Sequence, residues 1–228
     1  MHGFANDHRV NWVEPGVVDA LVAGGRKVIV YDARGHGESD KPHTPEAYEH
    51  DAMPNDARAL LDHLRIEVVD VVAYSMGSGM AARWVPDEPR VRSLVLGGVG
   101  ESSLRGRLSP DERAALAEAL EAADPATIPK GRPRTFRRLA DYSGADRLAL
   151  AAMQRSATPE GSTRFEAISV PTLVIAGDQD ELAGSPAVLA DRIPGATVRV
   201  VEGTHFSAVA DPAFAAAIVD FVTGVATT

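Results

Sequence analysis

The chain has 228 residues and contains no cysteine. Disulfide bonds, thiolate nucleophiles and zinc or iron–sulfur centres held by cysteine are therefore excluded. The sequence also lacks an apolar run of about 18 residues, the length that a transmembrane helix requires. A basic segment followed by an apolar core, which marks a signal peptide, is absent as well. We therefore expect a cytoplasmic protein without a membrane span, although a start at MHGF also leaves room for an upstream leader.

Basic charge is scarce, with 23 Lys and Arg residues against 32 Asp and Glu residues and a formal net charge of -9. The one basic cluster, KGRPRTFRR at 130–138, is interpreted as a solvated helix face. Because a nucleic-acid-binding protein normally carries a basic face, we expect no nucleic-acid partner.

Short apolar strands alternate with helical stretches along most of the chain. The predicted strands are β-branched runs that read as buried on both faces of a parallel sheet. They occupy 27–32, 68–75, 93–98, 172–177 and 197–203. Helices are predicted over 14–25, 44–64 with a bend at Pro54, 76–85 and 211–222. This alternation predicts an α/β protein with a doubly wound, mainly parallel sheet of about five strands.

Residues 101–169 interrupt the alternation because they contain no clear strand. Two amphipathic helices are predicted there, at 109–123 and 145–157, and the segment is too long for a plain loop. We therefore predict a helical lid over 101–169, inserted into a core formed by 1–100 and 170–228.

The stretch AYSMGSG at 73–79 leads from a predicted strand directly into a predicted helix. Such a small-x-Ser-x-Gly turn strains the backbone and projects the serine hydroxyl out of the sheet. Ala73 and Gly77 supply the small residues that a close approach of strand and helix requires. The alternative is that Ser75 only caps the helix, but the context favours Ser75 as a nucleophile.

A serine hydroxyl needs a base and an acid to act as a nucleophile. Of the seven histidines, only His205 lies in a loop just beyond a late strand, in GTHF. Asp178 and Asp180 follow the strand at 172–177. These loops share the carboxyl edge of the sheet with Ser75, where functional residues of parallel sheets gather. The chain order serine, aspartate, histidine is that of the α/β-hydrolase arrangement.

With these motifs, the sequence resembles the α/β-hydrolase fold family over nearly its whole length. HGF at 2–4 resembles the oxyanion-loop motif, YDARGHGESDKP the loop after the fourth strand, and PTLVIAGDQD the acid strand. The family's G-x-x-D form maps the acid to Asp180, with Asp178 as a competitor. A minority of relatives place the acid after the sixth strand, where this chain has Glu101.

Within the family, the resemblance is to small serine esterases and to cofactor-free haloperoxidases or perhydrolases. It implies hydrolysis of small to medium carboxylic esters through Ser75, His205 and Asp180, with an acyl-enzyme intermediate. The backbone N–H groups of Phe4 and Met76 would form the oxyanion hole. A perhydrolase, lactonase or carbon–carbon bond hydrolase with the same triad stays open, as does a catalytically impaired binding module.

No cofactor and no metal are expected. His43, Glu46 and His50 have helical spacing but lack the His-x-x-x-His geometry of helical zinc sites. They are interpreted as a solvated helix face, and the expected partner is a small-molecule ester.

The resemblance also implies a strand before HGF, between those equivalent to 27–32 and 68–75, and two more strands before it. The sequence as given shows none of the three, so we expect a short sheet. Three explanations stay open: the strands lie upstream, strands 27–32 and 68–75 pair directly, or a homodimer fills the gap by strand exchange.

Overall fold

The structure is a computed structural model, and it describes residues 1–49, 51–105, 108–156 and 163–225. Its sheet has four parallel strands in the order β1-β2-β3-β4. The strands are β1 (Val69–Tyr74), β2 (Val91–Gly97), β3 (Thr172–Gly177) and β4 (Thr197–Val201). All four form where the apolar runs predict them, and their carboxyl ends meet at one edge of the sheet.

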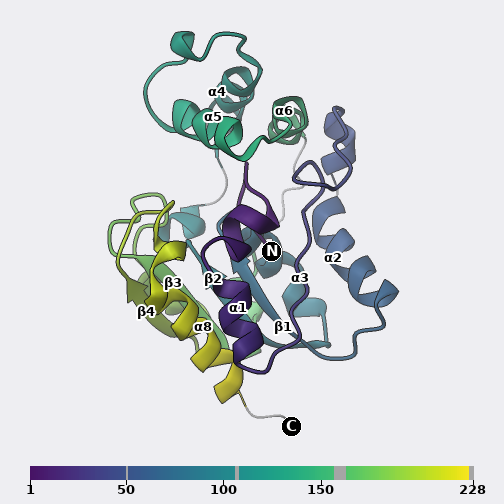
Figure 1. The fold of residues 1–228 in the computed structure, drawn as a ribbon, viewed down its shortest axis with the longest axis vertical. Helices are drawn as coiled ribbons and strands as arrows, with labels where there is room; N and C mark the ends of the chain where they lie inside the picture. The colour runs from purple at the N-terminus through teal and green to yellow at the C-terminus, as the bar shows by residue number, and fades with distance from the viewer. Residues whose placement is uncertain (50, 106–107, 157–162, 226–228) are drawn as a thin grey trace.

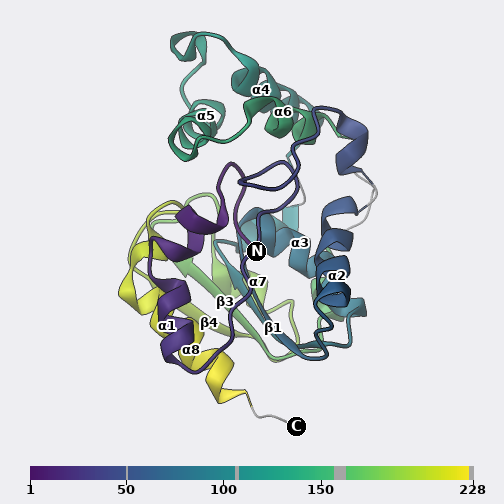
Figure 2. The ribbon, with the colours of Figure 1, turned by 45° about the vertical axis from the view of Figure 1, so that its right-hand side comes forward.

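Helices cover both faces of this sheet (Figures 1 and 2). On one face lie α1 (Val17–Ala23) and α8 (Pro212–Gly224), and on the other α2 (Ala52–His63), α3 (Met76–Trp84) and α7 (Pro186–Ala190). Successive residues of β2 serve the two faces in turn. Leu94 and Leu96 pack with α2, α3 and α7, whereas Val95 packs with α1 and α8. Burial on both sides explains the continuous apolar strands.

Three further helices stand beyond the carboxyl edge of the sheet, at the top of Figure 1. They are α4 (Pro110–Glu121), α5 (Arg132–Ser143) and α6 (Arg147–Arg155). Ser109 and Glu112 form a capping box at the start of α4, and the Asp146 carboxylate caps α6. Leu116, Leu120 and Leu150 form an apolar core of their own with Phe4 and Ala5.

The predicted strand at 27–32 is wrong, because these residues form no strand in the structure. Ile29 and Val30 are 37% and 38% exposed. Residues 1–3 lie between this segment and β1. The Met1 amino group donates to the Val72 carbonyl at 2.7 Å, and the Ala33 N–H donates to Nε2 of His2 at 2.9 Å. Residues 27–32 therefore have no neighbouring strand with which to form a ladder, and they do not pair directly with β1.

The predicted helix over 44–64 is divided. A 3-10 turn covers Pro45–Tyr48, and α2 begins at Ala52 after Asp51, which has φ +60°. The break therefore precedes the predicted bend at Pro54. Pro54 lies in the first turn of α2, where its missing N–H costs no intrahelical hydrogen bond.

In the described part of the chain, no helix combines the length and the hydropathy needed to cross a bilayer.

Candidate active site

Ser75 occupies the sharp turn between β1 and α3. Its backbone has φ +50° and ψ -113°, a region that residues with a side chain rarely adopt. The Ser75 N–H donates to the Gly97 carbonyl at 2.8 Å, which fixes the turn against the end of β2. The strained conformation predicted from the sequence is therefore present, and it places the Ser75 hydroxyl at the carboxyl edge of the sheet.

Gly77 is small for a reason that the sequence did not reveal. A Cβ atom at position 77 would lie 2.5 Å from the Met1 carbonyl oxygen and 2.8 Å from that of His2. The backbone that approaches position 77 most closely is therefore that of the N-terminal loop. From the sequence, only the approach of the strand and the helix to each other was expected. A side chain at position 77 would displace the loop that carries Phe4.

Ser75, His205 and Asp180 form one chain of hydrogen bonds. His205 Nε2 lies 2.9 Å from Ser75 Oγ, and His205 Nδ1 lies 2.9 Å from Asp180 Oδ2. The Asp180 side chain is fully buried, and it also accepts the Ala183 N–H at 2.9 Å. With Nδ1–H donating to the carboxylate, Nε2 is left to accept the serine proton.

The two alternative acids lie elsewhere. Asp178 is exposed, and its carboxylate accepts the Gly203 N–H at 2.9 Å, so it ties the acid loop to the histidine loop. Glu101 forms an ion pair with Arg105 at 2.7 Å. The structure thus brings Asp180 to His205, and brings neither Asp178 nor Glu101 there.

Tyr74 positions the histidine loop, a role that the sequence analysis missed. Its hydroxyl donates to the His205 carbonyl at 2.8 Å. Burial raises the pKa of Tyr74, so the phenol stays protonated and can donate this hydrogen bond. The available signal was its place directly before Ser75, since a residue there must lie beside the other loops of the site.

The predicted oxyanion loop runs past Ser75. A Cβ atom at Gly3 would lie 3.4 Å from the Ser75 Cβ, and the Gly3 N–H is held by Asn11 Oδ1 at 2.8 Å. Phe4, Met76 and Ser75 line the same cavity. Within the described residues, the N–H groups of Phe4 and Met76 have no hydrogen-bond acceptor. Unpaired donors of this kind are what an oxyanion hole needs.

Two buried histidines hold the loop in place. His2 Nε2 accepts the Ala33 N–H at 2.9 Å, while its Nδ1 lies 2.8 Å from the Gly3 carbonyl. His36 Nε2 accepts the Ala5 N–H at 3.3 Å. Because each Nε2 accepts a hydrogen bond, both imidazoles are neutral in this arrangement. Burial lowers the pKa of His36 to about 4 and that of His2 to about 3.

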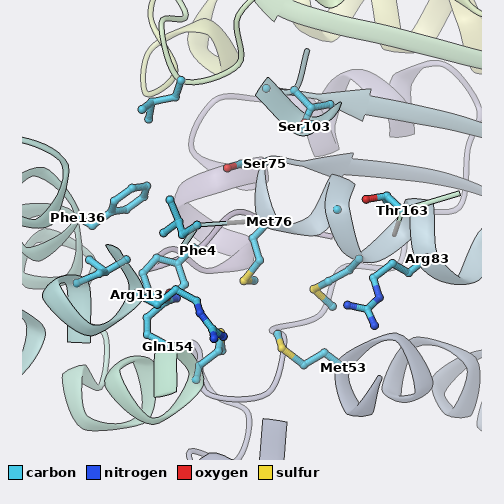
Figure 3. Close-up of a pocket in the computed structure, with 18 of the residues that line it drawn as sticks. Phe4, Met53, Ser75, Met76, Arg83, Ser103, Arg113, Phe136, Gln154 and Thr163 are labelled. Atoms are coloured by element: carbon cyan, nitrogen blue, oxygen red, sulfur yellow. The ribbon is translucent and has the colours of Figure 1, made fainter. Parts of the chain in front are cut away.

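A cavity of about 380 Å³ opens in front of Ser75, between the sheet edge and helices α4–α6. This is within the range of small-molecule sites. Figure 3 shows Ser75 between Phe136 on one side and Met76 and Met53 on the other. Phe136 of α5 is in ring contact with both Phe4 and Phe206, at centroid distances of 5.6 Å and 6.1 Å. The three-helix segment therefore touches both loops that flank the serine.

No group of three or more histidine and carboxylate side chains suited to a metal ion occurs among the residues that the structure describes. His43 lies 2.9 Å from an Asp146 oxygen, which joins the loop before α2 to the start of α6. Glu46 is exposed, and His50 lies outside the described residues.

A serine in a strained strand-to-helix turn, bound to an imidazole that is bound to a buried carboxylate, is the geometry of a serine hydrolase triad. Its chain order and its place on a parallel α/β sheet are those of the α/β hydrolases. The family profile described as "alpha/beta hydrolase fold" matches residues 1–160. The chain belongs to the α/β-hydrolase fold family.

Known relatives fall into several activity groups. A 3-oxoadipate enol-lactonase from Acinetobacter baylyi is 28% identical over 81% of this chain and 74% of its own. A non-heme chloroperoxidase from Kitasatospora aureofaciens is 29% identical over 81% of this chain and 76% of its own. The crystal structure of a bromoperoxidase from Bacillus anthracis superposes with a TM-score of 0.77 at 25% identity, covering 97% of this chain and 90% of the other.

Proposed function

We propose that the protein is a carboxylic-ester hydrolase that acts on small to medium acyl groups. The observation that carries the proposal is the continuous hydrogen-bonded chain from Ser75 Oγ through His205 to Asp180. Such a triad attacks carboxylic esters without a cofactor. We also propose that residues 101–169 act as a lid over a core of 1–100 and 170–228, because α4–α6 close the cavity above Ser75.

In the first half of the reaction, Ser75 Oγ attacks the ester carbonyl carbon while His205 Nε2 takes the hydroxyl proton. Asp180 holds the imidazole in the required tautomer and stabilises its positive charge. The tetrahedral intermediate collapses, the carbon–oxygen bond to the alcohol breaks, and His205 returns its proton to the leaving alcohol. Ser75 is left as an acyl ester.

In the second half, water attacks the acyl-enzyme and His205 acts again as the base. The intermediate in each half carries a negative oxygen, which the N–H groups of Phe4 and Met76 would bind. One such donor is worth about 100- to 1000-fold in rate. The position of Phe4, held by the loop bonds of His2 and His36, is therefore part of the proposed machinery.

A lactonase or a perhydrolase activity of the same triad is the second candidate. The curated relatives named enol-lactonase and chloroperoxidase support it. A lactone is a cyclic ester, and hydrogen peroxide can replace water in the second half of the reaction, so either activity requires the same residues.

A fluorophosphonate probe tests the proposal because it reacts covalently with activated serines. The wild-type protein should be labelled at Ser75, and Ser75→Ala should not be labelled, as seen by intact mass. Ser78→Ala, in the helix that follows Ser75, is a matched control because its hydroxyl donates to the Gly97 carbonyl at 2.9 Å and not to His205. Absence of wild-type labelling would instead support a binding module on this fold. A panel of p-nitrophenyl esters and lactones, with and without peroxide, then separates the enzyme activities.

A further inference from the structure

Methionine is concentrated at the cavity. The chain has five methionines, and four of them line the cavity in front of Ser75. Met53 comes from α2, Met76 and Met80 lie one turn apart on α3, and Met153 comes from α6. Three separate helices therefore supply the same residue type to one surface, which we name the methionine wall.

The methionine wall is packed as a unit. Met53 and Met80 are buried together with Tyr48, and Met76 and Met153 pack against the same cluster. Figure 3 shows the side chains of Met76 and Met53 extending toward each other. The wall begins at the residue after the nucleophile, so any group attached to Ser75 Oγ on that side must lie along it.

Two of the three arginines that line the cavity have partners in the protein, and the third, Arg132, is exposed at the start of α5. Arg83 forms an ion pair with Asp51, and Arg113 donates to the Ser156 carbonyl at 2.9 Å. The methionine wall itself offers no hydrogen-bond donor. Thioether side chains are polarizable, unbranched and able to change rotamer, so they fit apolar groups of differing shape. The recognition chemistry of this surface is therefore that of an aliphatic chain.

The two sides of Ser75 differ in exposure. Met53 and Met80 of the methionine wall are buried, whereas Phe206, which is in ring contact with His205 and Phe136, is 42% exposed. The acyl group stays bound to Ser75 between the two halves of the reaction, while the alcohol must leave. A buried wall suits the group that stays, and an exposed rim suits the group that leaves.

We propose that the methionine wall binds the acyl chain and that the preferred substrates are esters of medium-length aliphatic acids. Met80 and Met53 then set the limit on chain length, and the preference is broad because the wall adapts to its ligand. This inference rests on the proposed ester hydrolase function and names the substrate class of that site.

The test compares kcat/KM for p-nitrophenyl acetate, butyrate and octanoate. Met80→Ala should raise the octanoate-to-acetate ratio about tenfold, because the shortened side chain admits additional methylenes, each worth at least that factor. Met80→Leu, which keeps the volume, should stay within about threefold of the wild type. Leu148→Ala, on the exposed side of α6, should leave the ratio unchanged. The Met153 side chain is half-buried, so Met153→Ala provides the same test if Met80→Ala does not fold.

The results separate this inference from the proposed function. The role of the methionine wall alone would be overturned if the protein hydrolyses esters and is labelled by the probe, but its chain-length ratio does not change in Met80→Ala, Met53→Ala and Met153→Ala. A wild-type preference for p-nitrophenyl hemisuccinate over butyrate by tenfold or more would overturn it in favour of arginine recognition of an anionic acyl group. Failure of the wild-type protein to react with the probe would overturn the proposed function itself.

Hydrogen peroxide gives a second readout of the methionine wall. Each thioether sulfur takes one oxygen from peroxide to become a sulfoxide, and water is released. Octanoate hydrolysis should then fall at least fivefold more than acetate hydrolysis, because a polar group enters the apolar wall. A variant with leucine at 53, 76, 80 and 153 should keep its ratio after the same treatment, and equal loss of both activities in the wild type would contradict the proposal.

Discussion

Asp178 and Asp180 stand two positions apart in the same turn, yet they have different partners. Asp180 is buried against His205, whereas Asp178 is exposed and binds the Gly203 N–H. The G-x-x-D spacing favoured Asp180, and in the structure Asp180 is the aspartate that contacts His205. The use of Asp178 as a tie between two loops was not predictable, because it depends on where the histidine loop lies in space.

Exchange of each aspartate for asparagine should separate the two roles. Asp180→Asn should lower kcat/KM for p-nitrophenyl butyrate by about 10⁴-fold, because the amide no longer holds the required imidazole tautomer. Asp178→Asn keeps an oxygen that can accept the Gly203 N–H, so it should stay within about threefold of the wild type. A larger loss in Asp178→Asn than in Asp180→Asn would show that the acid has been assigned to the wrong residue.

At the scale of elements, apolar patterning predicted the four strands and most of the helices that pack on them, but it did not predict α7 at 186–190. It failed at 27–32, where the β-branched run is present but no strand lies beside it. A strand is defined by its pairing, which a local pattern does not contain. The prediction of one helix over 44–64 failed for a different reason. The helix is broken at Asp51, which has a positive φ that composition does not specify.

The N-terminal loop that carries Phe4 is a second element whose support could not be recognised from the sequence. His2 and His36 were present in the quoted motifs, but their burial as neutral acceptors depends on how the loops at 1–5 and 31–37 fold together. Both pKa values lie below the value of about 6.5 for an exposed histidine. The unfolded chain therefore binds protons that the folded chain does not bind.

The free energy of unfolding should consequently fall as the pH drops below about 6.5, with the His36 contribution lost progressively down to about pH 4. His36 alone accounts for about 2–3 kcal/mol between pH 7 and pH 4.5. Hydrogen bonds from the backbone N–H groups of Glu38 and His8 lower the pKa of Asp32 despite its burial, which adds a loss of the same sign at lower pH.

Urea unfolding at pH 7.0, 5.5 and 4.5 measures this dependence. His36→Gln removes the titrating group while its amide oxygen can still accept the Ala5 N–H, so its pH profile should be flatter than that of the wild type. His63→Gln is a suitable control because His63 is exposed at the end of α2. Equal slopes for wild type and His36→Gln would contradict the assignment.

For the molecule as a whole, the helices at 110–121 and 147–155 were predictable, but the way they are joined was not. The basic cluster at 130–138 was interpreted as a solvated face, and for Arg137 this was wrong. Arg137 is 3% exposed, and its guanidinium donates to the carbonyls of Ala119 and Ala122 at the end of α4. A buried guanidinium requires such partners, and these came from a helix that periodicity could not orient.

Arg137→Met should loosen α4–α6 without unfolding the sheet. The loss of hydrogen bonds from a charged donor costs about 2–3 kcal/mol. It removes the Arg137 donor from the Ala119 carbonyl and leaves the Ala122 carbonyl with only the longer bond from Arg147 at 3.4 Å. Hydrogen exchange should accelerate at least tenfold within 110–155 and stay unchanged in β2 and β3. Arg138→Met is the matched control, since Arg138 is exposed on the same helix. Equal acceleration in the sheet would show that the two parts unfold as one.

The methionine wall also makes the cavity observable. Methyl groups of methionine give sharp, separate signals in nuclear magnetic resonance spectra when they are selectively carbon-13 labelled. Because four of the five methionines line the cavity, labelling one amino acid type places nearly all of its reporters where a ligand would sit. Ligand binding and the proposed acylation of Ser75 can thus be followed at the site without attaching a foreign group to the protein.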